Sequence, residues 1–397
     1  MARRLAAALV TTACLIASLV VTTSATTVAT PTGDGPAPGP VKAIGGPAHH
    51  PTHRHTVTLP TGDTVAVTTQ PGGRVAARVT PDSPGGLGSM FYTLRMHGQT
   101  FVVPADALSD FGSRWDVHDF AVTRDSGPSP AAAKPSYNMR TLTVDIRQLT
   151  GQRGRVPFVI LNVDHMSKYA RFEASPTTDL RRLSVPVGHY CVIAFFTDYN
   201  RDTGAYTERI VTAPDVTVPT GSDAKVVLDE HSATRKVQVH TPRPSTRKAV
   251  SAMVYRADTA GVGATYGFTM TAADQDIYVK PTRQVRVGQL KYTDYLRLAA
   301  PDGSYLYDVG YPTSGRVPAD VDHHPTPADL ATVDATYTAD VPGRSESEQR
   351  FSWVRWQTLS VLTAGSRLTT PTQRTEYVIG GHRIDWQQTM TTMSGFR

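Results

Sequence analysis

Apolar and polar positions alternate over many short stretches of the chain. Leu142, Val144 and Ile146 alternate with polar residues, and turn residues such as Pro-Asp-Gly-Ser at 301–304 separate comparable stretches. This period of two, interrupted by turns, is typical of β-strands. Residues 191–196 are apolar without a break, as expected of a fully buried strand in a sandwich core. The pattern therefore predicts a mainly β protein.

The pattern divides the chain into three predicted folded units. Residues 56–123 are predicted to form a small α/β unit, because strand patterns are followed by apolar residues at helical spacing after Pro104. Evenly spaced short strands over 139–239 indicate an immunoglobulin-like or transthyretin-like β-sandwich. Residues 250–397 are again rich in strand patterns, which favours a second sandwich or jelly roll.

The first 29 residues have the order of a secretory signal peptide. Residues 3–4 are arginines, residues 5–21 are apolar and uncharged, and small residues follow, with cleavage expected after Ala25 or Ala29. The sequence therefore predicts a secreted, extracellular protein that is free of the membrane after cleavage. An uncleaved single-span anchor is the alternative.

Residues 30–55 are rich in Pro, Gly and His and lack periodicity, which predicts a flexible linker. The linker contains His49, His50, His53 and His55. Imidazoles at this density are able to hold a divalent metal, and a solvated tail is the alternative interpretation.

Composition narrows the classes of function. Hydrophobic residues make up 40% of the 397 residues, charged residues make up 19%, and the net charge is +6. This dispersed excess gives no reason to expect a nucleic-acid partner. Two cysteines exclude a disulfide framework, and Cys14 would leave with the signal peptide. The remaining Cys191 lies in the apolar run, where we expect a buried and unreactive thiol.

Motif searches find no complete catalytic site. The chain has no Gly-x-Ser-x-Gly elbow, His-Glu-x-x-His pair or phosphate-binding Gly-Lys-Ser/Thr loop. Residues 202–204, Asp-Thr-Gly, match the tripeptide of aspartic peptidases but occur once, although those enzymes need two carboxylates. Residues 88–90, Gly-Ser-Met, fail the spacing of a subtilisin-type serine motif. We therefore predict no catalytic residue, no cofactor and no enzyme activity.

One further polar cluster leaves metal binding open. Asp320, Asp322, His323 and His324 follow Pro318 in an irregular, proline-flanked connection. Carboxylates and imidazoles are metal ligands, so weak metal binding is one interpretation and a polar loop is the other.

Several short motifs resemble parts of large secreted subtilisin-like serine peptidases of high-GC bacteria. Motifs similar to their propeptide region are residues 56–59, 61–65, 103–107 and 115–122, and motifs similar to their post-catalytic and distal regions are residues 142–144, 185–190, 213–218, 227–229, 375–377 and 385–386. In that family a protease domain separates the two parts, whereas here only residues 124–138 lie between them. The resemblance therefore implies a chain related to the flanks of a subtilase, without its catalytic domain.

These observations favour a secreted, non-catalytic β-sandwich protein for binding or interaction. The alternatives are a trans-acting inhibitor or folding helper of a separate subtilase, and a degenerate peptidase-family protein. The expected partner is accordingly either a separate subtilisin-like protease or another extracellular protein.

Overall fold

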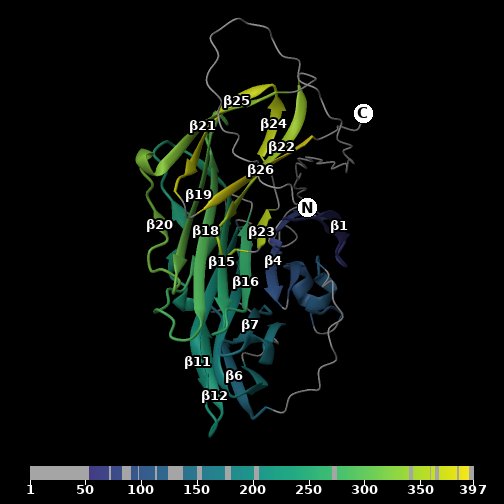
Figure 1. Ribbon diagram of the computed structural model, residues 1–397, viewed down its shortest axis with the longest axis vertical. Helices are drawn as coiled ribbons and strands as arrows, with labels where there is room; N and C mark the ends of the chain where they lie inside the picture. Colours follow the sequence, from purple (N-terminus) through teal and green to yellow (C-terminus); the bar gives the residue numbers. More distant parts are fainter. Residues whose placement is uncertain are drawn as a thin grey trace, which may run out of the picture.

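The computed structural model is built from β-strands joined by short loops (Figure 1). It describes residues 53–392 except for 71–72, 83–90, 97, 112–113, 124–136, 150–153, 175–179, 201–204, 271–274, 339–342, 358, 363–365 and 382–383. The helical segments among the described residues are short 3₁₀ turns. The predicted mainly β class is confirmed. The signal peptide and most of the predicted linker lie outside the described residues.

Two sheets form a sandwich at the lower end of the molecule (Figure 1). The three-stranded sheet has the order β12 (Ala224–Asp229), β6 (Met139–Arg147) and β9 (Leu180–Pro186). The six-stranded sheet has the order β13 (Arg235–Lys236), β17 (Asp276–Val279), β11 (Tyr206–Val218), β10 (Gly188–Tyr199), β7 (Pro157–Asn162) and β8 (Ala170–Ala174). Leu142 of β6 and Val192 of β10 share the core between the two sheets.

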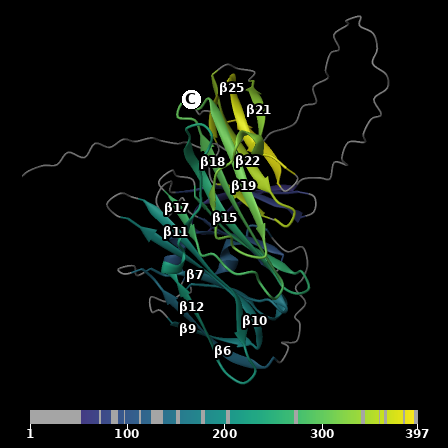
Figure 2. The same ribbon diagram turned by 90° about the vertical axis from the view of Figure 1, so that its left-hand side faces the viewer.

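An eight-stranded sheet runs along the long axis toward the other end (Figure 2). Its order is β21 (Leu330–Tyr337), β25 (Thr372–Ile379), β19 (Tyr305–Ser314), β18 (Gln289–Ala299), β15 (Thr246–Ala257), β16 (Gly263–Met270), β4 (Phe91–Met96) and β5 (Gln99–Pro104). One face packs on the six-stranded sheet, where the rings of Tyr92 and Phe195 meet edge to face with centroids 5.6 Å apart.

The six-stranded sheet is therefore buried on both faces. Along β10, Cys191, Ile193 and Phe195 face the eight-stranded sheet, whereas the alternate residues 192, 194 and 196 face the three-stranded sheet. A strand with two buried faces needs apolar residues at every position, which explains the unbroken apolar run and confirms its predicted burial. Burial raises the pKa of the Cys191 thiol to about 11, so this thiol is protonated at neutral pH.

Three smaller sheets and several short turns are also present among the described residues. The four-stranded sheet contains β1 (His53–Thr58), β2 (Thr64–Thr69), β3 (Val75–Thr80) and β23 (Leu359–Leu362). The others are β24 (Ser366–Thr370), β22 (Arg344–Trp353) and β26 (Asp385–Thr392), and the pair β14 (Gln238–Val239) and β20 (Asp322–His323). The turns include the 3₁₀ segments η3 (Asp106–Asp110), η4 (Val117–Phe120), η5 (Met166–Lys168), η6 (Glu230–Ser232) and η7 (Pro327–Asp329).

Residues 56–123 differ from the expected α/β unit in two respects. The expected helix after Pro104 is the 3₁₀ turn η3, which ends where Phe111 enters the core. The strands also pair outside the unit, because β4 pairs with β16 and β3 pairs with β23. Strand pairing joins segments that are distant in sequence, so local patterns did not reveal it. In addition, β1 begins at His53, inside the segment predicted as a linker.

A buried ion network lies between the eight-stranded sheet and the sheet of β22, β24 and β26. Its members are Arg297, Arg350, Arg374, Asp308, Glu348 and Glu376. Arg297 donates to both carboxylate oxygens of Asp308, at 2.9 and 3.1 Å, and to Glu348 at 3.1 Å. Three guanidiniums therefore balance three carboxylates, which offsets the large cost of removing each charge from water.

Glu208 is a buried acid outside this network, and its contribution to stability is expected to depend on pH. Burial raises the pKa of Glu208 well above its ordinary value, and the nearby Glu230 charge acts in the same direction, although a hydrogen bond from Thr197 lowers it. An acid whose pKa is higher in the folded state stabilises the fold below its unfolded pKa, and this contribution is lost as the pH rises through the folded value.

Glu208→Gln should therefore raise stability at neutral pH and flatten its pH dependence. In the wild type, unfolding free energy should fall by up to about 1.4 kcal/mol per pH unit above the ordinary pKa of glutamate. Urea unfolding between pH 4 and 8 would measure the unfolding free energy of the wild type and of Glu208→Gln. If the unfolding free energies of the two proteins changed equally with pH, this would contradict a raised pKa at Glu208.

No helix among the described residues is both long enough and apolar enough to cross a membrane.

Candidate functional site

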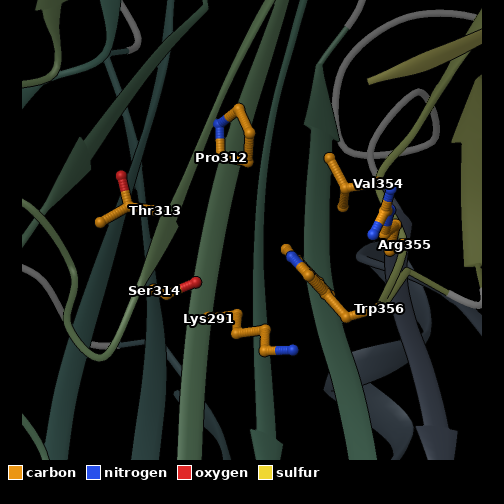
Figure 3. Close-up of a pocket in the computed structure, with 7 residues that line it drawn as sticks. All are labelled: Lys291, Pro312, Thr313, Ser314, Val354, Arg355 and Trp356. Atoms are coloured by element: carbon orange, nitrogen blue, oxygen red, sulfur yellow. The ribbon is translucent and has the colours of Figure 1, made fainter. Parts of the chain in front are cut away.

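An open pocket of about 770 Å³ lies between the end of β19 and the turn that follows β22 (Figure 3). Its volume is in the range of small-molecule sites. The seven residues that line it are Lys291, Pro312, Thr313, Ser314, Val354, Arg355 and Trp356. Figure 3 shows one wall from β19 and the opposite wall from residues 354–356, with Lys291 between them.

The pairing of three long strands places the floor of the pocket. Lys291 of β18 lies opposite Ser314 of β19 on one side and opposite Tyr255 of β15 on the other. Residues directly opposite in an antiparallel pair have neighbouring side chains on one face. A lysine, a hydroxyl and an aromatic ring from three separate segments therefore project from the same face of the sheet.

A tight turn holds Trp356 over this floor. The backbone N–H of Gln357 donates to the carbonyl of Val354 at 2.8 Å, and the buried Gln357 side chain donates to the carbonyl of Leu359 at 2.8 Å. The preceding Trp353 is itself buried in a small apolar cluster. A satisfied buried amide on one side and a buried indole on the other fix the position of the turn.

The aromatic ring of Trp356, which lines the pocket, contacts a second ring, that of Tyr255, next to the lining. The rings of Trp356 and Tyr255 lie with centroids 5.6 Å apart and planes tilted by 35°, and the Lys291 ammonium is 5.8 Å from the Tyr255 ring. Gly263 makes room for Tyr255, since a Cβ at this position would lie only 2.2 Å from ring atoms of the tyrosine. The bare glycine backbone therefore lets the tyrosine ring lie flat across the neighbouring strand.

The chemistry of the pocket suits a negatively charged ligand with an apolar face. Lys291 and Arg355 supply two cations, Ser314 supplies a hydroxyl, and no carboxylate is among the seven lining residues of the described chain. Lysine and arginine form strong charge-assisted hydrogen bonds with carboxylates. The adjacent Trp356 face offers an apolar surface for stacking.

A second hollow, of about 580 Å³, lies beside β11. Lys280, Arg283 and Arg286 give it a basic character. Its Asp215 accepts hydrogen bonds from the backbone N–H of Arg286 at 3.0 Å and from Arg256 at 3.4 Å. These bonds tie the lining segments together, and the lining residues include no tryptophan, tyrosine or phenylalanine. The pocket at Trp356 is therefore the better candidate for a binding site.

Most residues singled out from the sequence do not gather into one site. Residues 88–90 and 202–204, together with His49 and His50, lie outside the described residues. His53 and His55 are exposed on β1, and Nε2 of His55 lies 2.9 Å from the carbonyl oxygen of Val122. The described part of the histidine-rich segment therefore forms a strand edge.

The acidic-histidine segment divides between two faces. Asp322 and His324 meet His240, a residue that the sequence analysis did not single out, whereas His323 turns inward to Asp294 at 3.1 Å. The sequence patterns also gave no indication of the pocket at Trp356. Its seven residues come from three separate segments, and no local motif links them.

Comparisons with known proteins add little about function. No family model matches the chain, and no curated protein matches it. Among solved structures, a crystal structure described as that of a "putative adhesin" from Bacteroides ovatus is similar over 52% of this chain and 96% of its own, with 11% identity and a TM-score of 0.21. Likeness at this level carries no argument about function.

Proposed function

We propose that the chain is a secreted, non-catalytic protein that binds an anionic ligand in the pocket at Trp356. The observation that carries this proposal is the combination of an aromatic face with Lys291 and Arg355 in one open pocket. Secretion rests on the signal-peptide pattern of residues 1–29. A mainly β scaffold that holds a preformed polar and aromatic pocket is well suited to recognition.

A carboxylated saccharide is the ligand chemistry that fits this pocket best. The C–H face of a sugar ring can stack on the Trp356 indole, while one of its hydroxyl groups reaches Ser314. A ring carboxylate would pair with the Lys291 ammonium or the Arg355 guanidinium. The half-buried Trp356 is already held by its turn, so little ordering is required when the ligand binds.

Binding should weaken in two pocket variants and stay unchanged in a charge-matched control. We expect Lys291→Gln and Trp356→Ala each to weaken binding of oligogalacturonate at least about tenfold, because each removes an interaction of roughly 1.4 kcal/mol or more. Lys248→Gln removes a positive charge at an exposed position on β15 outside the pocket lining and should leave binding unchanged. Isothermal titration calorimetry would measure the affinity of the wild type and the three variants for oligogalacturonate.

The ionic component can be tested in the same experiment. Binding to oligogalacturonate should weaken as salt is raised, because exposed ion pairs are screened. A neutral maltooligosaccharide of equal length should bind more weakly than the acidic one. Equal affinity for the two saccharides, or equal affinity of the wild type and the two pocket variants, would contradict the proposal.

The resemblance to subtilase flanks supports a second proposal, a trans-acting inhibitor or folding helper. The sheet pairing favours the first proposal, since β4 and β3 pair with β16 and β23 and thus tie the propeptide-like segment into the rest of the protein. Slowing of a subtilisin-like protease at a stoichiometric ratio would support the second proposal. Covalent labelling of a serine in the purified protein by a fluorophosphonate would indicate an enzyme instead.

A further inference from the structure

We propose that His240, Asp322 and His324 form a binding site for a divalent transition metal, with Zn²⁺ as the ion whose chemistry fits best. One potential ligand atom from each of these side chains lies within 4.8 Å of the other two. Two imidazole nitrogens and one carboxylate oxygen are a common protein ligand set for zinc. The site lies apart from the residues that line the pocket at Trp356 and is independent of the proposed function.

Parallel strand pairing brings the three residues together. Gln238 of β14 lies opposite Asp322 of β20, and Val239 lies opposite His323. The hydrogen bond from the backbone N–H of His240 to the carbonyl of His323, at 2.8 Å, continues this register by one residue. Because side chains alternate along a strand, His240, Asp322 and His324 project from the same face.

The distances within the cluster suit a small tetrahedral ion. The Nε2 atoms of His240 and His324 lie 3.0 and 3.6 Å from Oδ1 of Asp322. Metal–ligand bonds of about 2.0–2.1 Å in a tetrahedron place neighbouring ligand atoms roughly 3.3 Å apart. Both observed distances are therefore within about 0.3 Å of the geometry that a bound zinc ion requires.

The carboxylate oxygen at the centre of the cluster is enclosed and has spare bonding capacity. Oδ1 of Asp322 is shielded from solvent, and no described residue donates a hydrogen bond to it with acceptable geometry, although both Nε2 atoms approach it. A buried oxygen without a hydrogen bond is unfavourable. A cation held between the carboxylate and the two imidazoles would supply the missing interaction.

Residues around the cluster restrict the movement of its ligands. The rings of His240 and His324 stack with centroids 4.5 Å apart and planes 7° from parallel. Between two of the ligands in sequence, His323 points to the opposite side, where its ring stacks on Tyr311 and its Nε2 lies 3.1 Å from the buried Asp294. This inward anchor fixes β20. A metal lies in the plane of each imidazole that binds it, so one of the two stacked rings, both of which are exposed, must rotate when the metal binds.

The ligand types decide which ions should bind. Imidazole ligands favour zinc and other late first-row metals, whereas calcium and magnesium prefer sites made of oxygen ligands. All three side chains are partly exposed, so the remaining coordination positions are open to water. We therefore expect one Zn²⁺ ion per chain that millimolar Mg²⁺ does not displace.

Titration of the mature chain with Zn²⁺ in competition with a chromogenic chelator would test the site. We expect His240→Ala, Asp322→Asn and His324→Ala each to lower the affinity of one equivalent of Zn²⁺ at least tenfold. His231→Ala is the matched control, because His231 is also exposed and lies 3.0 Å from a carboxylate oxygen of Asp229. This control variant should bind Zn²⁺ as the wild type does.

The histidine-rich segment needs its own control. A variant with His49, His50, His53 and His55 replaced by alanine should still bind one equivalent of Zn²⁺. Loss of all Zn²⁺ binding in this variant, or unchanged binding after His240→Ala and His324→Ala, would overturn the proposal. The visible spectrum of the Co²⁺-loaded wild type gives a second readout, and a spectrum identical to that of aqueous Co²⁺ would also overturn it.

Discussion

Replacing Asp308 by asparagine should destabilise the protein by about 3–5 kcal/mol, the range found when one partner of a buried ion pair is removed. Asp308 is fully buried and accepts two hydrogen bonds from Arg297, while Nη1 of Arg350 lies 3.5 Å from its Oδ2. Asparagine keeps the shape of aspartate but leaves the network with one uncompensated positive charge. Chemical denaturation followed by circular dichroism measures the change in unfolding free energy.

The difference in unfolding free energy between the wild type and Asp308→Asn should depend on pH, because the Asp308 carboxylate has a shifted pKa. Burial alone would raise the pKa of Asp308, but the charges of Arg297 and Arg350, together with hydrogen bonds from Arg297 and Tyr295, hold the pKa below its usual value. An acid with a lowered pKa stabilises the fold above its unfolded pKa of about 3.9 and loses this contribution as the pH falls through the folded value. The difference between wild type and Asp308→Asn should therefore shrink in acid.

Two controls separate charge imbalance from a simple loss of contacts. The charge-balanced variant Arg297→Met/Asp308→Asn should lose less stability than the sum of its two single variants. Arg181→Gln removes one partner of an exposed ion pair with Glu173 and should change stability by about 0–1 kcal/mol. If Asp308→Asn also lowered the unfolding free energy by only about 0–1 kcal/mol, the buried network would not contribute the expected stability.

Phe195→Ala and Phe196→Ala should each cost about 3–5 kcal/mol, the usual range for a buried phenylalanine. These neighbours on β10 face opposite sides, and each ring is 1% exposed. In a strand with one solvated face, one of the two substitutions would be nearly neutral. Two large losses are therefore expected only if the six-stranded sheet is covered on both faces.

The matched control for this pair is Leu180→Ala. Leu180 is an apolar strand residue of β9, and it is 48% exposed, so its truncation should have a small effect. Urea unfolding of the three variants gives the comparison directly. A small loss for either phenylalanine variant would contradict the packing of the six-stranded sheet between two layers.

The two proposed binding sites show where local sequence patterns stop being informative. Asp322 and His324 were recognisable as metal-ligating residue types from the sequence, but His240 lies far away along the chain and reaches them only through the pairing of β14 with β20. Likewise, Lys291 and Trp356 belong to no shared motif, and the packing of the turn after β22 against the large sheet brings them together.

The sequence by itself determined the mainly β class and the burial of residues 191–196, because alternation and unbroken apolar runs are local consequences of strand geometry. Only the tertiary structure decided which strands pair, and therefore that β4 joins β16 and that the charges of Arg297 and Asp308 are enclosed together. The physical reason is that the hydrogen bonds of a sheet do not depend on side-chain identity. Partners distant in sequence are selected by the packing of the whole molecule.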